Sequence, residues 1–173
     1  MPAKTKTPQP GFDLEYNSLR AEILKRIELR QQLISITLTL AGVFLGIGLG
    51  KESVALIYPP LAMFLAFGWA QNDFRIRNLA DYIRKNLESP ATGLRYEHAV
   101  QAGRMDIKGL GSWRFVVVSH IGIFLFTQAM ALMIELARIG FNLSLLTLTQ
   151  WILLGISLLS MFFVGWIARQ SGR

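Results

Sequence analysis

The chain has 173 residues, of which 52% are hydrophobic, and a formal net charge of +7. It contains no cysteine, which excludes disulfides, thiolate chemistry and cysteine-ligated metals. A soluble domain of this length has too small a core for so many apolar residues, and these residues form four long blocks rather than a helical or strand period. The sequence therefore predicts an integral membrane protein.

The predicted fold is an all-α, polytopic membrane bundle. Residues 1–11, rich in Pro, Lys and Thr, are expected to be a disordered tail, and residues 12–173 a single membrane domain. An amphipathic helix is predicted over residues 14–30. Each apolar block is close to the roughly 20 residues that cross a bilayer as a helix, which predicts four spans. The spans are residues 33–50, 53–70, 115–134 and 143–168, and the long connection is residues 71–114.

Lysine and arginine predict the orientation of these spans. Sixteen of the 18 lie before the first span, between the second and third, or after the fourth, whereas the two short opposite connections hold only Lys51 and Arg138. The positive-inside rule therefore places both termini and the long connection in the cytoplasm, most simply at a cell inner membrane. Interfacial tryptophans are expected on the same side: Trp69, Trp113 and Trp166. The basic charge is thus assigned to the membrane, and no nucleic-acid partner is expected.

Two apolar stripes continue beyond the membrane on the cytoplasmic side. Leu19, Ile23 and Ile27 recur at four-residue steps within residues 14–30. A second stripe follows the second span and ends at Ser89-Pro90, where proline disfavours helix: Phe74, Leu79, Ile83 and Leu87. We predict a helical hairpin that projects from spans one and two. Its stripes either bury only against each other or also contact another subunit or a partner.

The rest of the long connection, residues 91–114, is less regular because it contains four glycines. Apolar residues such as Tyr96 and Val100 alternate there with basic residues such as Arg95 and Arg104. Two readings are equally favoured. One is a short helix on the inner leaflet with its basic residues toward anionic lipid headgroups, and the other is a linker held by Trp113.

Small residues form a stripe along the first span, at spacings of three and four: Ser35, Thr39, Gly42, Gly46 and Gly50. Such a stripe allows another helix backbone to approach closely. The simpler prediction is contact with the second span of the same chain, and the alternative is contact between subunits.

The second span contains Pro59-Pro60. Proline removes a backbone donor and frees a carbonyl, which at membrane depth needs another partner. A static kink is the expectation, and a gating hinge or an ion-coordinating break is the alternative.

Polar residues inside the spans are the default indicators of function in such a protein. Four are candidates for a pore or a polar intramembrane site: His120, Gln128, Glu135 and Gln150. Glu135, with Gln150, Asn142 and Thr149, is either part of a cation-attracting mouth or a solvated interfacial carboxylate paired with Arg138. His120 either relays protons or, more simply, bonds to a neighbouring helix.

The sequence offers no catalytic motif. It has two histidines, no paired carboxylates within a span and no zinc-protease or nucleophile-turn pattern, so no catalytic residue, metal or cofactor is expected. We expect a small homo-oligomeric channel or pore-forming membrane effector. The alternative is a non-conducting adaptor whose cytoplasmic hairpin binds a soluble protein or anionic lipid.

Overall fold

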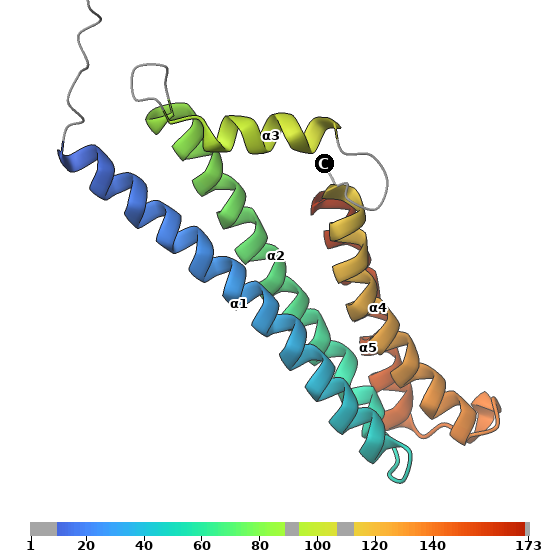
Figure 1. Cartoon of the computed structure of the whole chain (residues 1–173). Coiled ribbons are helices and arrows are strands. Elements are labelled where there is room, and N and C mark those ends of the chain that lie inside the picture. Colours follow the sequence, from blue (N-terminus) through green and yellow to red (C-terminus); the bar gives the residue numbers. More distant parts are fainter. Residues whose placement is uncertain (1–9, 89–93, 107–112, 172–173) are drawn as a thin grey trace, which may run out of the picture.

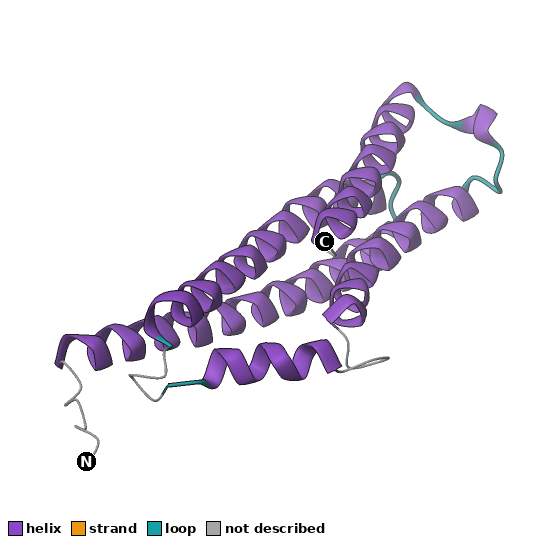
Figure 2. Ribbon diagram, turned by 90° about the horizontal axis from the view of Figure 1, so that it is seen from above, coloured by secondary structure: helices purple, strands orange, loops and turns teal. Residues whose placement is uncertain are grey.

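The computed structural model describes residues 10–88, 94–106 and 113–171, and all the regular structure in these ranges is helical (Figures 1 and 2). In chain order the helices are α1 (Pro10–Gly48), α2 (Tyr58–Tyr82), α3 (Tyr96–Asp106), α4 (Trp113–Arg138) and α5 (Leu148–Ser171). Short 3-10 turns precede α2 at Ala55–Ile57 and α5 at Leu143–Leu145, and a π-helical segment, Ile83–Leu87, extends α2. Helix α1 begins inside the predicted tail, and the remainder of that tail, residues 1–9, lies outside the described residues.

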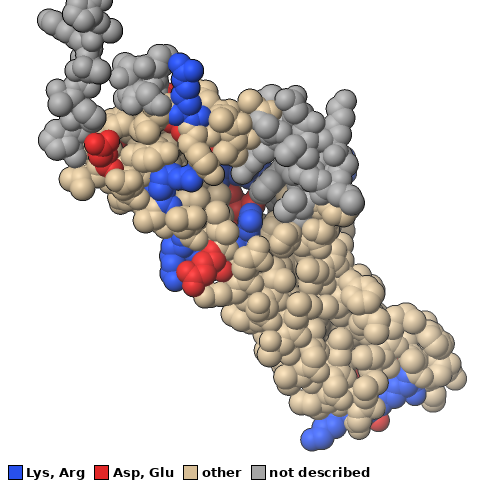
Figure 3. Space-filling view, in the orientation of Figure 1, with Lys and Arg blue, Asp and Glu red and all other residues tan. Residues whose placement is uncertain are grey.

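Charged side chains are gathered at the two ends of the molecule, with a broad uncharged surface between them (Figure 3). In the sequence this uncharged band corresponds to residues 31–50 of the first block, 53–72 of the second, 115–134 of the third and 139–168 of the fourth. The helical part in α1, residues 31–48, is about 27 Å long at the rise of an α-helix, close to the thickness of a bilayer's hydrocarbon core. Large apolar side chains are exposed along the band, including Phe64, Phe126 and Phe162. This surface fits lipid rather than water.

Among the described residues, three helices are long and apolar enough to cross a membrane, namely residues 11–48, 117–138 and 148–170. Helix α2 is not among them, because part of the second apolar block forms the turn that precedes Tyr58. Helix α2 instead packs against α1, α4 and α5. Its buried residues recur every three or four positions and include polar ones: Tyr58, Pro59, Ala62, Ala66, Trp69 and Asp73. A helix that packs against three others needs less apolar surface than one that mostly faces lipid, although α2 also exposes Phe64.

The predicted hairpin is present as a packed pair of helix extensions. Ile23 of α1 is buried together with Ile83 and Leu87, and the remaining stripe residues Leu19, Ile27 and Leu79 pack around them. Phe74 departs from the prediction. It is 60% exposed, and Ile76 packs in the cluster instead, because the helix turns position 74 away from α1. The stripes bury against each other in a single chain.

The prolines do not kink α2. Pro59 and Pro60 lie in its first turn, where a missing backbone donor breaks no bond within the helix body. The backbone before them is already helical, and the carbonyls they leave free find other donors. The Tyr58 N–H donates to the Ala55 carbonyl, and the Ser157 hydroxyl of α5 lies 3.3 Å from the Leu56 carbonyl. The predicted kink is therefore corrected to a helix start.

Helix α3 crosses the charged end of the molecule, from the end of α2 toward the start of α4 (Figure 1). A helix was one of the two readings of this connection. Residues 91–93 and 107–112 of this connection lie outside the described residues, and its contact with lipid headgroups stays a prediction.

Candidate functional site

Glu135 lies at the centre of a polar cluster where the α1–α2 turn meets α4 and α5. Its carboxylate accepts hydrogen bonds from Gln150 Nε2 at 2.9 Å and from the Ser53 backbone N–H at 3.3 Å. Arg138 Nη1 lies 3.6 Å away, as an ion pair. Gln150 Oε1 in turn accepts from the backbone N–H of Thr147 at 2.8 Å. We refer to Glu135, Gln150, Ser53 and Thr147 as the turn-end clasp.

In the clasp Glu135 lies beside Gln150 and pairs with Arg138, but the surroundings of both Glu135 and Gln150 differ from either sequence reading. Glu135 is 1% exposed and Gln150 5%, so neither lines an open mouth in the single chain and the carboxylate is not solvated. Asn142 and Thr149, the other residues expected there, are exposed, and Asn142 instead caps the Leu143–Leu145 turn by accepting from the Ser144 N–H. The clasp therefore holds the α1–α2 turn, α4 and α5 together.

Gln128 occupies the middle of the bundle. It is fully buried on the same face of α4 as Phe124 and Ala131, which belong to two separate apolar clusters. Within the described part of the chain, neither its Oε1 nor its Nε2 has a hydrogen-bond partner. An unsatisfied buried amide costs free energy, so Gln128 is a weak point of the core or a site kept polar for function.

His120 packs against a tryptophan side chain. Its ring stacks on Trp69 of α2 with the ring centroids 5.5 Å apart and the planes 24° from parallel. Trp69 itself is 1% exposed, so it belongs to the core and is not the interfacial anchor predicted from the sequence. Trp166 is 49% exposed, as an anchor would be. His120 of α4 therefore contacts a neighbouring helix, α2, through ring stacking.

A hydroxyl pair that the sequence did not reveal joins the same two helices deeper in the band. The buried Tyr58 hydroxyl donates to Thr127 Oγ1 at 2.7 Å, and Thr127 donates to the backbone carbonyl of Ile123 at 2.8 Å. Tyrosine near an apolar stretch is common, so no sequence signal marked this pair.

The small-residue stripe of α1 faces outward. Ser35, Thr39, Gly42, Gly46 and Gly50 are all exposed, together with Gln32 one turn before them. A Cβ atom added at Gly42 or Gly46 would meet nothing within 4 Å. The predicted contact with the second span is therefore wrong, because α2 packs on the opposite face, through Ile34, Thr37 and Ala41. We call this outward surface, from Gln32 to Gly50, the small face.

Asp73 ties α1 to α2 at the edge of the uncharged band. Its carboxylate is fully buried and pairs with Arg30 Nη1 and with Arg77 Nη2, each at 2.8 Å. This cluster was not predicted from the sequence, although a signal existed. Arg30 is the last charge before the first apolar block and Asp73 the first after the second, and adjacent antiparallel spans bring such positions together.

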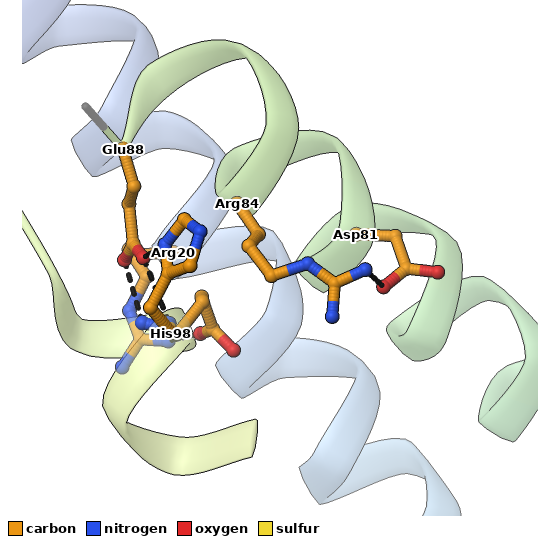
Figure 4. A network of polar contacts seen from close by, with 6 residues as sticks. Arg20, Asp81, Arg84, Glu88 and His98 are labelled. Atoms are coloured by element: carbon orange, nitrogen blue, oxygen red, sulfur yellow. Dashed lines mark hydrogen bonds and ion pairs between the residues drawn. The ribbon is translucent and has the colours of Figure 1, made fainter. Parts of the chain in front are cut away.

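Glu88 fixes α3 to the end of α2 (Figure 4). Its carboxylate accepts from the backbone N–H groups of Glu97 at 2.6 Å and of His98 at 2.9 Å, in the first turn of α3, and it contacts His98 Nδ1 at 2.9 Å. Burial opposes ionisation, but these hydrogen bonds prevail and lower the pKa of Glu88 below its ordinary value. Arg20 of α1 adds an ion pair with Glu97.

In the described ranges no three His, Asp or Glu side chains come together as metal ligands. The site features are therefore a buried clasp, an unsatisfied core amide, an outward small face and an arginine-rich charged end. Comparison with known proteins adds no relative, since no protein-family model, curated protein or solved structure matches the chain.

Proposed function

We propose that this chain is a four-span membrane protein with its termini and charged hairpin in the cytoplasm, and that it forms a homo-oligomeric ion channel. Three apolar helices and the uncharged band support a membrane location. Helix α2 serves as the fourth span, since its block is uncharged over residues 53–72 and it packs against α1, α4 and α5. The concentration of Lys and Arg at the hairpin end supports the orientation, in an inner membrane.

The observation that carries the oligomer is the small face of α1. Only 17% of the apolar window of α1 is buried within the chain, which leaves this helix the least covered of the three. Its glycine half, Gly42 to Gly50, allows the backbone of a second subunit to approach, and the outward position rules out use of that half within the chain. A polar surface directed at lipid is unfavourable, so a second subunit is the natural occupant.

The other half of the small face supplies the conduction route in this proposal. Gln32, Ser35 and Thr39 present an amide and two hydroxyls on the exposed side of α1. Repeated around a closed symmetry axis, these groups would line a polar path, while large apolar side chains such as Phe64, Phe126 and Phe162 are exposed elsewhere on the band. Glu135 and Gln150 are not part of that path, because both are buried inside the subunit.

The test is the oligomeric state of the purified protein, by native mass spectrometry in detergent and in nanodiscs, together with ion flux from proteoliposomes. Gly46→Leu should yield monomers and abolish flux without lowering folding stability, because a side chain at position 46 has room in the single chain. Gly155→Leu is the matched control. This glycine of α5 is also exposed and free of neighbours, so the variant should behave as wild type. A monomeric or simply dimeric wild type would rule out the pore.

A non-conducting adaptor is the second candidate, and the exposed apolar residues of the hairpin favour it. Leu14 is 72% exposed and Phe74 60%, both outside the uncharged band. A partner that docks there would be lost from the purified protein with Phe74→Asp. Ile83→Asp is unsuitable for this test, since Ile83 is fully buried and its replacement would unfold the hairpin. Flux in wild-type vesicles that Gly46→Leu removes would argue against the adaptor.

A further inference from the structure

The connection between α4 and α5, residues 139–147, exposes large apolar side chains at the end of the molecule opposite the charged hairpin (Figure 1). Phe141 is 60% exposed and Leu145 63%, and Leu143 between them is exposed as well. The connection contains no charged residue. Three large apolar side chains on an uncharged loop are unfavourable in water, so a medium other than water is expected around them.

The polar groups of the connection are bonded within the chain. Eight of the nine backbone N–H groups from Ile139 to Thr147 donate to acceptors of the same chain. The Ser144 hydroxyl donates to Asn142 Oδ1 at 2.6 Å, and the Thr147 hydroxyl donates to Gln150 Oε1 at 3.0 Å. A loop in water can leave such groups to the solvent, whereas a loop in contact with lipid must satisfy them internally. The bonded polar groups therefore point to lipid independently of the apolar side chains.

Phe141 has a backbone conformation that suits glycine or asparagine better. Its φ is 58°, directly after Gly140 with a φ of 60°, and its N–H donates to the Leu136 carbonyl at 2.9 Å where α4 ends. The phenyl ring gains little from contacts within the chain, because most of it is exposed. Contact with lipid would give the ring the burial that the single chain does not.

The surroundings of the connection favour lipid. Directly after it comes α5, an apolar helix long enough to cross a membrane from residue 148. The charge that precedes the connection, Arg138, pairs with the buried Glu135, and only 24% of its side chain is exposed. The α1–α2 turn at the same end differs, since it carries the exposed charged residues Lys51 and Glu52. This contrast fits lipid around the connection and water around the turn.

We propose that the α4–α5 connection is a lipid-docking loop, which inserts Phe141, Leu143 and Leu145 into the adjoining leaflet. The side chains would lie about 5 to 10 Å into the boundary between headgroups and acyl chains, the depth of other interfacial apolar segments. The loop would thereby fix the level of the α4 end and the α5 start in the membrane. The proposal rests on the membrane location alone and needs neither the orientation, the oligomer nor conduction.

The experiment uses single spin labels on the full chain in proteoliposomes, since the chain has no native cysteine. A label at Leu145→Cys should collide more with oxygen, which concentrates in lipid, than with a water-soluble nickel chelate. Leu158→Cys, exposed in the middle of α5, is the lipid reference, and Glu52→Cys in the α1–α2 turn is the water reference. The ratio of oxygen to nickel accessibility at Leu145 should be close to that at Leu158 and above that at Glu52.

A ratio at Leu145 equal to that at Glu52, with Leu158 in lipid, would overturn the lipid-docking loop and leave the membrane location intact. A Leu158 label that is accessible to the nickel chelate would instead overturn the membrane location itself. A Leu145 label protected from both collision partners would mean that a second copy of the chain covers the loop, and the lipid proposal would be wrong.

A second variant tests whether the apolar surface holds the loop in lipid. With the label at Leu143→Cys, Leu145→Asp should shift the label toward the nickel chelate, because a carboxylate is unfavourable in lipid. Leu145→Met keeps the surface apolar and should leave the label in lipid. Both variants should fold, since Leu145 is exposed in the single chain. Equal accessibilities in the two variants would contradict the proposal.

Discussion

Ser157 of α5 donates toward the backbone carbonyl of Leu56, the group that Pro60 leaves without a helical donor. The hydroxyl shares its proton with the carbonyl of Leu153, one turn earlier in its own helix, at 2.8 Å. Thus one serine satisfies a proline-freed carbonyl across a helix interface within the uncharged band, where water is scarce.

We expect Ser157→Ala to lower the free energy of unfolding by roughly 0.6 kcal/mol, the average for an interhelical hydrogen bond in a membrane protein. Steric trapping or reversible denaturation in mixed micelles would measure it. Ser160→Ala is the control, because the Ser160 hydroxyl is equally buried and bonds only to the Ile156 carbonyl of its own helix in the described structure. An effect of equal size in both variants would contradict an interhelical role.

Glu135 and Gln150 should be energetically coupled. Each of Glu135→Leu and Gln150→Leu leaves buried polar groups without partners, which costs roughly 1 to 3 kcal/mol of stability. Since the two residues share one hydrogen bond, the double variant should lose at least about 0.5 kcal/mol less than the sum. A double-mutant cycle on unfolding free energies measures this. Additive losses, or a change of ion selectivity in folded Glu135→Gln, would contradict a purely structural clasp.

Gln128→Leu should stabilise the protein. The substitution removes a fully buried amide that has no partner in the described structure and replaces it with a side chain that suits the flanking apolar clusters. A gain of roughly 1 kcal/mol is expected from the relief of an unsatisfied polar group. Thermal unfolding followed by circular dichroism would show a raised midpoint. A lowered midpoint would instead mean that the amide is bonded in the membrane.

The docking of α3 should weaken in acid. The pKa of Glu88 is lowered by hydrogen bonds in the folded state, so the docking free energy that it provides is present at neutral pH. It is lost as the pH falls from the ordinary value of 4.5 through the lowered one, when the carboxylate is protonated. The groups around it are His98, Glu97 and Arg20.

This pH dependence is measurable with paired spin labels, since the chain has no native cysteine. Labels at Leu14→Cys and Ala102→Cys, both exposed, report the separation of α1 and α3. The distance distribution should broaden below pH 4.5 in wild type and already be broad at pH 7 in Glu88→Gln. A narrow distribution at both pH values in the variant would show that Glu88 does not hold α3.

The helix positions and the hairpin were predictable because the apolar blocks and the stripe spacing depend only on local sequence. Leu19, Ile23 and Ile27 were correctly paired with Leu79, Ile83 and Leu87. Which side of α1 packs against the other helices was not predictable. Whether a small-residue stripe points to a neighbour or to lipid depends on the rotation of the helix, and α2 took the face that bears Ile34 and Ala41. A single sequence does not specify that rotation.

The polar contacts were likewise predictable where they depend on local sequence and not where they depend on packing. Glu135 and Gln150 flank a short connection, which made their proximity predictable, whereas their burial depends on how the α1–α2 turn folds over them through Ser53. Glu88 gave no signal, because its partners are backbone N–H groups of a helix whose direction the glycine-rich connection did not reveal.

Helix α1 is a single rod of 39 residues, with no glycine or proline between Phe12 and Ala41 to bend it. It is about 58 Å long, so a tilt of about 5° pivoted at the α1–α2 turn moves its far end by about 5 Å. Arg20 and Arg30 in its charged part and the glycines of the small face lie on this one helix. A shift of the hairpin therefore also changes the tilt of the surface on which subunits would meet.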